Sequence, residues 1–194
     1  PGTPDLISAS DTGSSDTDDF TNDTTPTFTG TCRDDEEVYL KINDVETGDY
    51  VTCSSSSYTL TVTDALTTDG PYQVSAFASS SGLISSGVSA DSVYDIFEIY
   101  TVLPTPNIFS PLDGATDVVS PVTVTGSCTS EEILINPGAV AATCTDSAYS
   151  ADITFSTSPA TITVTFTDFV GNASSTSIVI NPAAEDPDPE PEPD

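Results

Sequence analysis

Histidine, methionine and tryptophan are absent from the sequence, and basic residues are nearly so. Two Lys and Arg residues stand against 31 Asp and Glu residues in a chain of 194, for a formal net charge of −29 at pH 7. Two cations cannot form the basic surface that nucleic-acid phosphates require, and an anionic membrane surface repels so acidic a chain. We therefore expect neither nucleic acid nor an anionic membrane as a partner.

The missing histidine also limits the chemistry that the chain can perform. Without histidine there is no Ser-His-Asp triad, and cysteines that are held in disulfides offer no thiolate nucleophile. Paired carboxylates can hydrolyse glycosides, but a sequence this rich in acids contains such pairs by chance and does not fix their separation. We therefore expect that this protein is not an enzyme.

Long apolar runs are missing as well. None approaches the roughly 20 residues of a membrane-spanning helix, so we expect no membrane insertion by this fragment. Because the sequence has no starting methionine, we expect it to be part of a longer polypeptide, whose signal peptide and anchor, if any, lie elsewhere. The hydrophobic content of 36% can still supply a core.

The four cysteines end two short sequence motifs, each of which occurs twice in the chain. Cys32 ends "TFTGTC" and Cys53 ends "YVTC", whereas Cys128 ends "TVTGSC" and Cys144 ends "AATC". Four cysteines allow three pairings, and the repeated phrases select Cys32 with Cys53 and Cys128 with Cys144. Zinc is the alternative, but it favours Cys-x-x-Cys or histidine spacings. Disulfides indicate an oxidising compartment, and we expect the protein to be secreted, extracellular or at the cell surface.

These phrases belong to an internal repeat with an offset of roughly 95 positions. We expect one domain over residues 1–103 and a second over 104–182. We expect residues 183–194 to be an acidic, Pro-rich linker or tail, because alternating proline and acid cannot pack and favours an extended chain.

Apolar residues alternate within each unit. "EVYLKI" at 37–42 and "ATITVTF" at 160–166 place every second apolar side chain on one face, and no segment has an apolar stripe of helical period. Turn signals such as "DG" at 69–70 separate these short runs. The pattern predicts an all-β protein built from β-sandwiches.

Three stretches carry a family resemblance. They are "SDTG" at 10–13 with the residues that follow as far as Gly30, "LTTDGPYQV" at 66–74, and "TDFVGNAS" at 167–174. They resemble the bacterial Ig-like repeats found in tandem in very large secreted adhesins of the biofilm-associated and RTX type. Together with the cysteine pairing, the resemblance implies two tandem Ig-like β-sandwich domains, each with one intradomain disulfide.

What the resemblance implies for function is a structural role in cell adhesion. Such repeats form the stalk or spacer of a surface fibre, with adjacent repeat domains of the same chain as neighbours, and some are stiffened by Ca²⁺. Two alternatives remain open. One is a binding module that recognises a glycan or protein on another cell surface, and the other is a soluble secreted protein whose acidity is an adaptation to high salt.

The opening stretch carries candidate Ca²⁺ ligands. Ca²⁺ takes about six to eight oxygen ligands, which carboxylates and carbonyls supply. The EF-hand pattern fails, because Phe20 stands where an oxygen ligand is needed. A looser loop site would use the acidic side chains Asp11, Asp16, Asp18, Asp19 and Asp23.

The alternative is that these acids cap turns of a solvated loop by bonding to backbone amides. Two further acidic groups, residues 34–37 and Asp113 with Asp117, are open to the same two interpretations. Four tyrosines also allow two interpretations, a sugar-binding surface or residues of the core and sheet faces: Tyr50, Tyr58, Tyr72 and Tyr149.

Overall fold

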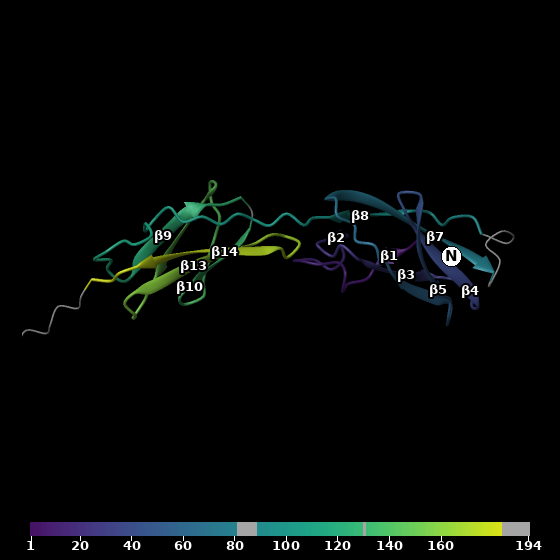
Figure 1. Cartoon of the computed structure of the whole chain (residues 1–194), viewed down its shortest axis with the longest axis horizontal. Helices are drawn as coiled ribbons and strands as arrows, with labels where there is room; N and C mark the ends of the chain where they lie inside the picture. The colour runs from purple at the N-terminus through teal and green to yellow at the C-terminus, as the bar shows by residue number, and fades with distance from the viewer. Residues whose placement is uncertain (81–88, 130, 184–194) are drawn as a thin grey trace, which may run out of the picture. The chain divides into compact units, whose positions relative to one another are not determined.

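A computed structural model of the chain describes residues 1–80, 89–129 and 131–183, and this part of the chain is built from β-strands (Figure 1). Its contacts divide it into two compact units. The first comprises Pro1–Val102 with Val170–Asn172, and the second begins at Leu103 and holds the rest. Within the described residues, no helix has the length and apolar character needed to cross a membrane. The fold is all-β, as the alternating pattern predicted.

The first unit is a β-sandwich of a three-stranded and a five-stranded sheet. The smaller sheet has the order β1-β3-β6, with bounds Asp5–Leu6, Thr27–Thr31 and Ser57–Thr61. The larger sheet has the order β2-β8-β7-β4-β5, with bounds Phe20–Thr21, Asp95–Ile99, Gly70–Ser80, Glu36–Ile42 and Val45–Thr52. Its neighbours pair antiparallel, except β2 and β8, which run parallel.

The core of the first unit lies between these sheets. Val38, Leu40 and Ile42 alternate along β4 and are buried, which confirms the face predicted from their spacing. Phe28 from the smaller sheet meets Phe97 from the larger one edge to face, with ring centroids 5.0 Å apart. Burial of these apolar side chains is the main force that holds the two sheets together.

The second unit is a smaller sandwich. Its two-stranded sheet pairs β12 with β9, with bounds Ala148–Ile153 and Val122–Ser127. Its four-stranded sheet has the order β11-β10-β13-β14, with bounds Val140–Ala142, Glu132–Asn136, Ala160–Thr167 and Ala173–Ile180. The predicted alternation along β13 is confirmed, because Ile162, Val164 and Phe166 are all buried.

Both predicted disulfides are present, one in each unit. Cys32 follows β3 and Cys53 follows β5, so the bond joins the two sheets of the first unit, with Cα atoms 5.9 Å apart. Cys128 follows β9 and Cys144 follows β11, and their Cα atoms are 5.8 Å apart. The described chain has no free cysteine.

In the first unit the chain starts and leaves at opposite ends of the long strand β7. The Gly2 amide donates to the Thr31 carbonyl at 2.7 Å, at the end of the sandwich where Glu36 pairs with Ser80. At the other end, where Gly70 pairs with Ile99, the Asp69 carboxylate accepts the Thr101 amide at 3.0 Å. The eleven residues of β7 separate these ends by about 35 Å.

Candidate metal centre

The loop from Ser10 to Thr27 is folded by short polar side chains that bond to nearby groups. Asp23 accepts the Ser10 hydroxyl at 2.8 Å and the Thr25 amide at 2.9 Å, while the Ser10 hydroxyl accepts the Thr27 amide at 3.0 Å. The buried Thr21 hydroxyl donates to the Ser10 carbonyl. Asp, Ser and Thr favour such turns because their side chains replace missing backbone partners. The loop therefore holds a defined shape beside β2.

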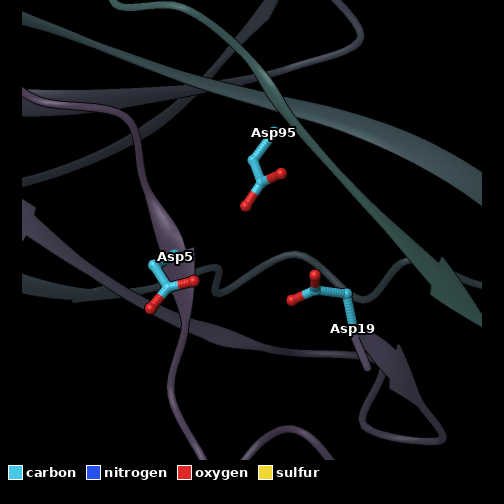
Figure 2. Close-up of side chains that lie close together, drawn as sticks. All are labelled: Asp5, Asp19 and Asp95. Atoms are coloured by element: carbon cyan, nitrogen blue, oxygen red, sulfur yellow. The ribbon is translucent and has the colours of Figure 1, made fainter. Parts of the chain in front are cut away.

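Three aspartates from separate segments converge next to this loop. Asp5 lies on β1, Asp19 directly precedes β2, and Asp95 begins β8. One carboxylate oxygen from each lies within 4.8 Å of those from the other two, and Figure 2 shows the three side chains pointing toward a common space. Asp19 has a positive φ of 61°, a conformation that aspartate adopts more readily than most residues. The register of β1 and β8 and the positive φ of Asp19 together bring the three carboxylates close to one another.

Asp11 and Asp18 lie on the loop side of Asp19. The Asp11 side chain is only 4% exposed, and its Oδ2 accepts the Asp19 amide at 3.3 Å. Its Oδ1 is buried and has no hydrogen-bond partner among the described residues. A buried carboxylate oxygen without a partner is costly, and a proton or a cation offsets that cost.

Burial and nearby carboxylates raise the pKa of two of these aspartates, Asp19 and Asp11. Burial raises the pKa of Asp19, and the carboxylates of Asp95, Asp11, Asp5 and Asp18 raise it further. Burial also raises the pKa of Asp11, to which the Asp18 carboxylate adds, although the bond from the Asp19 amide opposes the change. Like charges held this close disfavour one another's ionised forms, and a bound cation reverses this effect.

The donor set fits a hard cation better than a transition metal. Asp5, Asp19 and Asp95 offer carboxylate oxygens, which are the preferred ligands of Ca²⁺, with backbone carbonyls and water as additional ligands. Zinc prefers histidine and thiolate, whereas this sequence has no histidine and all of its cysteines form disulfides.

The structure places the five ligands predicted from sequence in different settings. Asp19 belongs to the converging group, and Asp11 and Asp18 adjoin it. Both oxygens of Asp23 accept hydrogen bonds from the loop, so this side chain acts as a turn cap. Asp16 is exposed on the loop. The sequence alone does not point to Asp5 or Asp95, because each stands apart from the acidic run and only the register of β1 and β8 brings it there.

Two aspartates of the other acidic groups considered from the sequence accept backbone amides from distant segments. Asp34 accepts the Ser56 amide at 2.6 Å, and Asp113 accepts the Val179 amide at 2.8 Å. Asp117 has a positive φ of 57° in the segment before β9. Asp34 and Asp113 therefore each join two segments through a backbone amide.

The comparisons with known proteins give one family match and several remote structural likenesses. Residues 1–82 match the family described as "Bacterial Ig-like domain". Among solved structures, the chain is similar to one titled "Biofilm associated protein - BSP domain", with 14% identity, a TM-score of 0.31, and coverage of 95% of this chain and 30% of that one. Among curated proteins, no sequence matches.

A second solved structure is titled "Structural insight into host cell surface retention of a 1.5-MDa bacterial ice-binding adhesin". It has 16% identity and a TM-score of 0.42, with coverage of 94% of this chain and 65% of that one. The present chain thus spans less than two thirds of either protein's length. TM-scores this low do not establish a common overall structure.

Proposed function

Because residues 1–82 match the bacterial Ig-like domain family, we propose that this chain is a structural module of an extracellular bacterial surface protein and serves as a stalk or spacer in cell adhesion. In this role its neighbours are adjacent repeat domains of the same polypeptide, and it has no catalytic function. The proposal is supported chiefly by the path of the chain through each unit.

Each unit receives the chain at one end and releases it at the other. In the first, these ends are separated by the length of β7. In the second, Asn107 bonds to Ser127 at the end of β9, whereas Ala183 donates to the Val118 carbonyl at 3.0 Å, shortly before β9 begins. Modules with this path can be joined in series, and each adds its own length to a fibre.

The parallel pairing of β2 and β8 fits a module that is under tension. The Glu98 amide donates to the Asp19 carbonyl and the Tyr100 amide to the Thr21 carbonyl, both at 2.8 Å. Pulling on the two ends of the unit slides these strands past each other, so their hydrogen bonds must break together rather than one at a time. The second unit has a similar parallel bridge between Val118 and Pro182.

Calcium at the aspartate cluster would strengthen the same strands. Asp5, Asp19 and Asp95 come from β1, the residue before β2, and the start of β8. An ion held by all three would link the first strands of the unit to its last strand. We therefore propose that Ca²⁺ stabilises the first unit against heat and against force.

Thermal unfolding of the full chain in EDTA and in added CaCl₂ tests the calcium site. We expect a higher Tm with calcium, corresponding to about 2.7 kcal/mol when free Ca²⁺ reaches about 100 times its Kd. Asp19→Asn and Asp95→Asn should abolish the increase. Asp16→Asn removes one charge from the exposed part of the loop and is the matched control, which should keep it.

Two results would contradict the calcium site. One is a pair of identical unfolding curves in EDTA and calcium. The other is an equal loss of the calcium effect in Asp16→Asn and Asp19→Asn, which would reflect general screening of the acidic loop.

The mechanical role is tested by single-molecule stretching of the full chain. We expect the first unit to unfold at higher force in calcium than in EDTA, because the ion links β1 and the start of β2 to β8. The segment between Cys32 and Cys53 should not extend until the protein is reduced. Unfolding of both units at forces too low to detect, with or without calcium, would contradict a stalk.

A further inference from the structure

A row of three aromatic rings crosses the outer face of the five-stranded sheet. Tyr39 on β4 stacks between Tyr50 on β5 and Phe77 on β7, with ring centroids 5.3 and 5.1 Å apart and interplanar angles of 26° and 13°. The three are direct cross-strand partners in the sheet register. Their neighbours Val38 and Leu40 face the core, so the row stands on the opposite face.

One end of this aromatic row is buried, and the other end is exposed to solvent. Phe77 is only 4% exposed, and the Lys41 ammonium lies 4.9 Å from its ring centroid. Lys41 is itself held by both oxygens of Asp91 at 2.9 Å. At the other end Tyr50 is 57% exposed, because β5 is the edge strand of the sheet (Figure 1). The stack therefore ends in a tyrosine ring that is open to solvent.

The edge strand β5 has a bulge close to Tyr50. Between Tyr39 and Lys41 the pairing of β4 with β5 shifts register, and the extra residues of β5 include Gly48. Gly48 has a φ of +85°, and a Cβ built on it would meet no atom within 4 Å. Bulges at sheet edges reorient neighbouring side chains, and here the bulge adjoins the exposed tyrosine.

Carboxylates flank the row. The Tyr39 hydroxyl donates to Glu37 at 3.0 Å, and Glu46 pairs in register with Lys41. Burial raises the pKa of Tyr39, the bond to Glu37 and the charge of Glu37 raise it further, and Tyr50 and Glu46 add smaller increases. Lys41, the cation of this face, is already paired with Asp91. The surface around the rings is consequently both aromatic and negative.

We propose that the aromatic row binds a glycan that carries free amino groups, such as a polymer of glucosamine. The flat apolar face of a sugar ring stacks on Tyr50, while its ammonium group is attracted to the tyrosine face and to Glu37 and Glu46. A net charge of −29 repels sulfated or carboxylated glycans and favours a cationic one.

The single exposed ring of the row favours a sugar over a protein partner. A stable protein interface usually buries about 800 Å² on each side around a well-packed apolar centre. Here one exposed ring, that of Tyr50, has the carboxylates of Glu37 and Glu46 nearby, which matches one or two sugar units bound through a few directed contacts. This site is additional to the spacer role and does not depend on the aspartate cluster.

Titration of the full chain with a fully deacetylated glucosamine hexamer tests the proposal, with the N-acetylated hexamer as the comparison ligand. Binding is measured by calorimetry at mildly acidic pH, where the amines are charged. EDTA is present so that metal binding at the aspartate cluster does not contribute to the measured heat. We expect the glucosamine hexamer to bind and the acetylated hexamer to bind at least about tenfold more weakly, a difference of ~1.4 kcal/mol.

Variants distinguish binding at the aromatic row from non-specific electrostatic binding of a polycation to an acidic chain. Tyr50→Ala should weaken binding about tenfold or more, and Tyr50→Trp should retain it. Tyr94→Ala is the matched control, because Tyr94 is 54% exposed, lies outside the row, and is replaced without a change of charge. Glu37→Gln and Glu46→Gln should weaken binding and reduce its dependence on salt.

Three outcomes would overturn the proposal. The first is no binding of the glucosamine hexamer at low salt. The second is binding that Tyr50→Ala and Tyr94→Ala change equally, since the chain's charge alone would then explain it. The third is equal affinity for the acetylated hexamer, which removes the requirement for free amines.

Discussion

The two units have the same framework, a disulfide and a glycine–tyrosine pair at equivalent strands, but they differ in their candidate binding sites. In each, a disulfide follows equivalent strands, and a glycine faces a buried tyrosine across a strand pair, Gly30 opposite Tyr58 and Gly126 opposite Tyr149. The acidic loop, the converging aspartates and the aromatic row belong to the first unit. Within the described residues, the framework is thus repeated, whereas the candidate binding features lie in the first unit.

The glycine and tyrosine pairs explain why both repeated cysteine motifs contain a glycine. A Cβ built on Gly30 would lie 2.6 Å from the Tyr58 ring, and Gly126 meets the Tyr149 ring in the same way. Each ring lies against the glycine backbone, so a side chain there would push it out of the core. The glycine in "TFTGTC" and "TVTGSC" is therefore a packing requirement.

The tyrosine hydroxyls differ between the units. Tyr149 donates to the Asn107 carbonyl at 2.5 Å, whereas the Tyr58 hydroxyl is buried without a partner in the described chain. Burial raises the pKa of Tyr149 to about 12, and it raises the pKa of Tyr58 as well. The second unit thus uses its tyrosine to fix the incoming segment, and the first does not.

The largest predicted effect is loss of either disulfide. Cys32→Ala with Cys53→Ala, and separately Cys128→Ala with Cys144→Ala, should each lower the stability of its own unit by about 3 kcal/mol, since both close loops of similar length. Hydrogen exchange measured on peptides from β4 and β10 reports on the two units separately. If either change reduced the protection from hydrogen exchange equally in both units, it would contradict the claim that each disulfide stabilises its own unit.

Replacing the buried tyrosines should give a smaller effect that differs between the two units. Tyr149→Phe removes a hydrogen bond and leaves the Asn107 carbonyl unpaired, at a cost of about 1 kcal/mol or more. Tyr58→Phe removes a buried hydroxyl without a partner and should be neutral or stabilising. Denaturant unfolding of the two variants checks this difference, and equal destabilisation would show that Tyr58 has a partner after all.

The smallest predicted effect concerns pH in the absence of metal. Asp11 and Asp19 have pKa values raised above 3.8 in the folded state, so they bind protons more tightly when folded. Their contribution to stability is complete below about pH 3.8 and is lost as pH rises through the raised values.

Asp19→Asn in EDTA should therefore gain stability relative to the original protein as pH rises from 3 to 7, by a modest amount because solvent screens these groups. Asparagine tolerates the positive φ at this position, so the backbone is kept. Unfolding curves across this pH range provide the measurement, with Asp16→Asn as control. A difference that does not change with pH would contradict the raised pKa of Asp19.

Much of the fold follows from local sequence pattern. Alternation along residues 37–42 and 160–166 predicted which side chains are buried, because the two faces of a strand have a fixed period of two. The duplicated phrases predicted the cysteine pairing, since equivalent positions in a repeat occupy equivalent places.

The candidate sites were less accessible to sequence reasoning. Asp5 and Asp95 meet Asp19 only through the register of β1 and β8, which no local pattern encodes. Tyr50 and Tyr58 look alike in the sequence, but Tyr58 is on a strand of the smaller sheet and faces the core, while Tyr50 lies on an edge strand and faces solvent. Sites formed by distant segments depend on tertiary pairing, which composition and spacing do not specify.

The Cys32–Cys53 bond has a consequence for resistance to proteolysis. Both basic residues of the sequence, Arg33 and Lys41, lie between these two cysteines. A protease that cleaves after arginine or lysine can therefore cut this chain only inside a covalently closed loop. The two sides of such a cut stay joined through sulfur, so the chain would remain connected in the presence of trypsin-like enzymes until a reductant opened the bond.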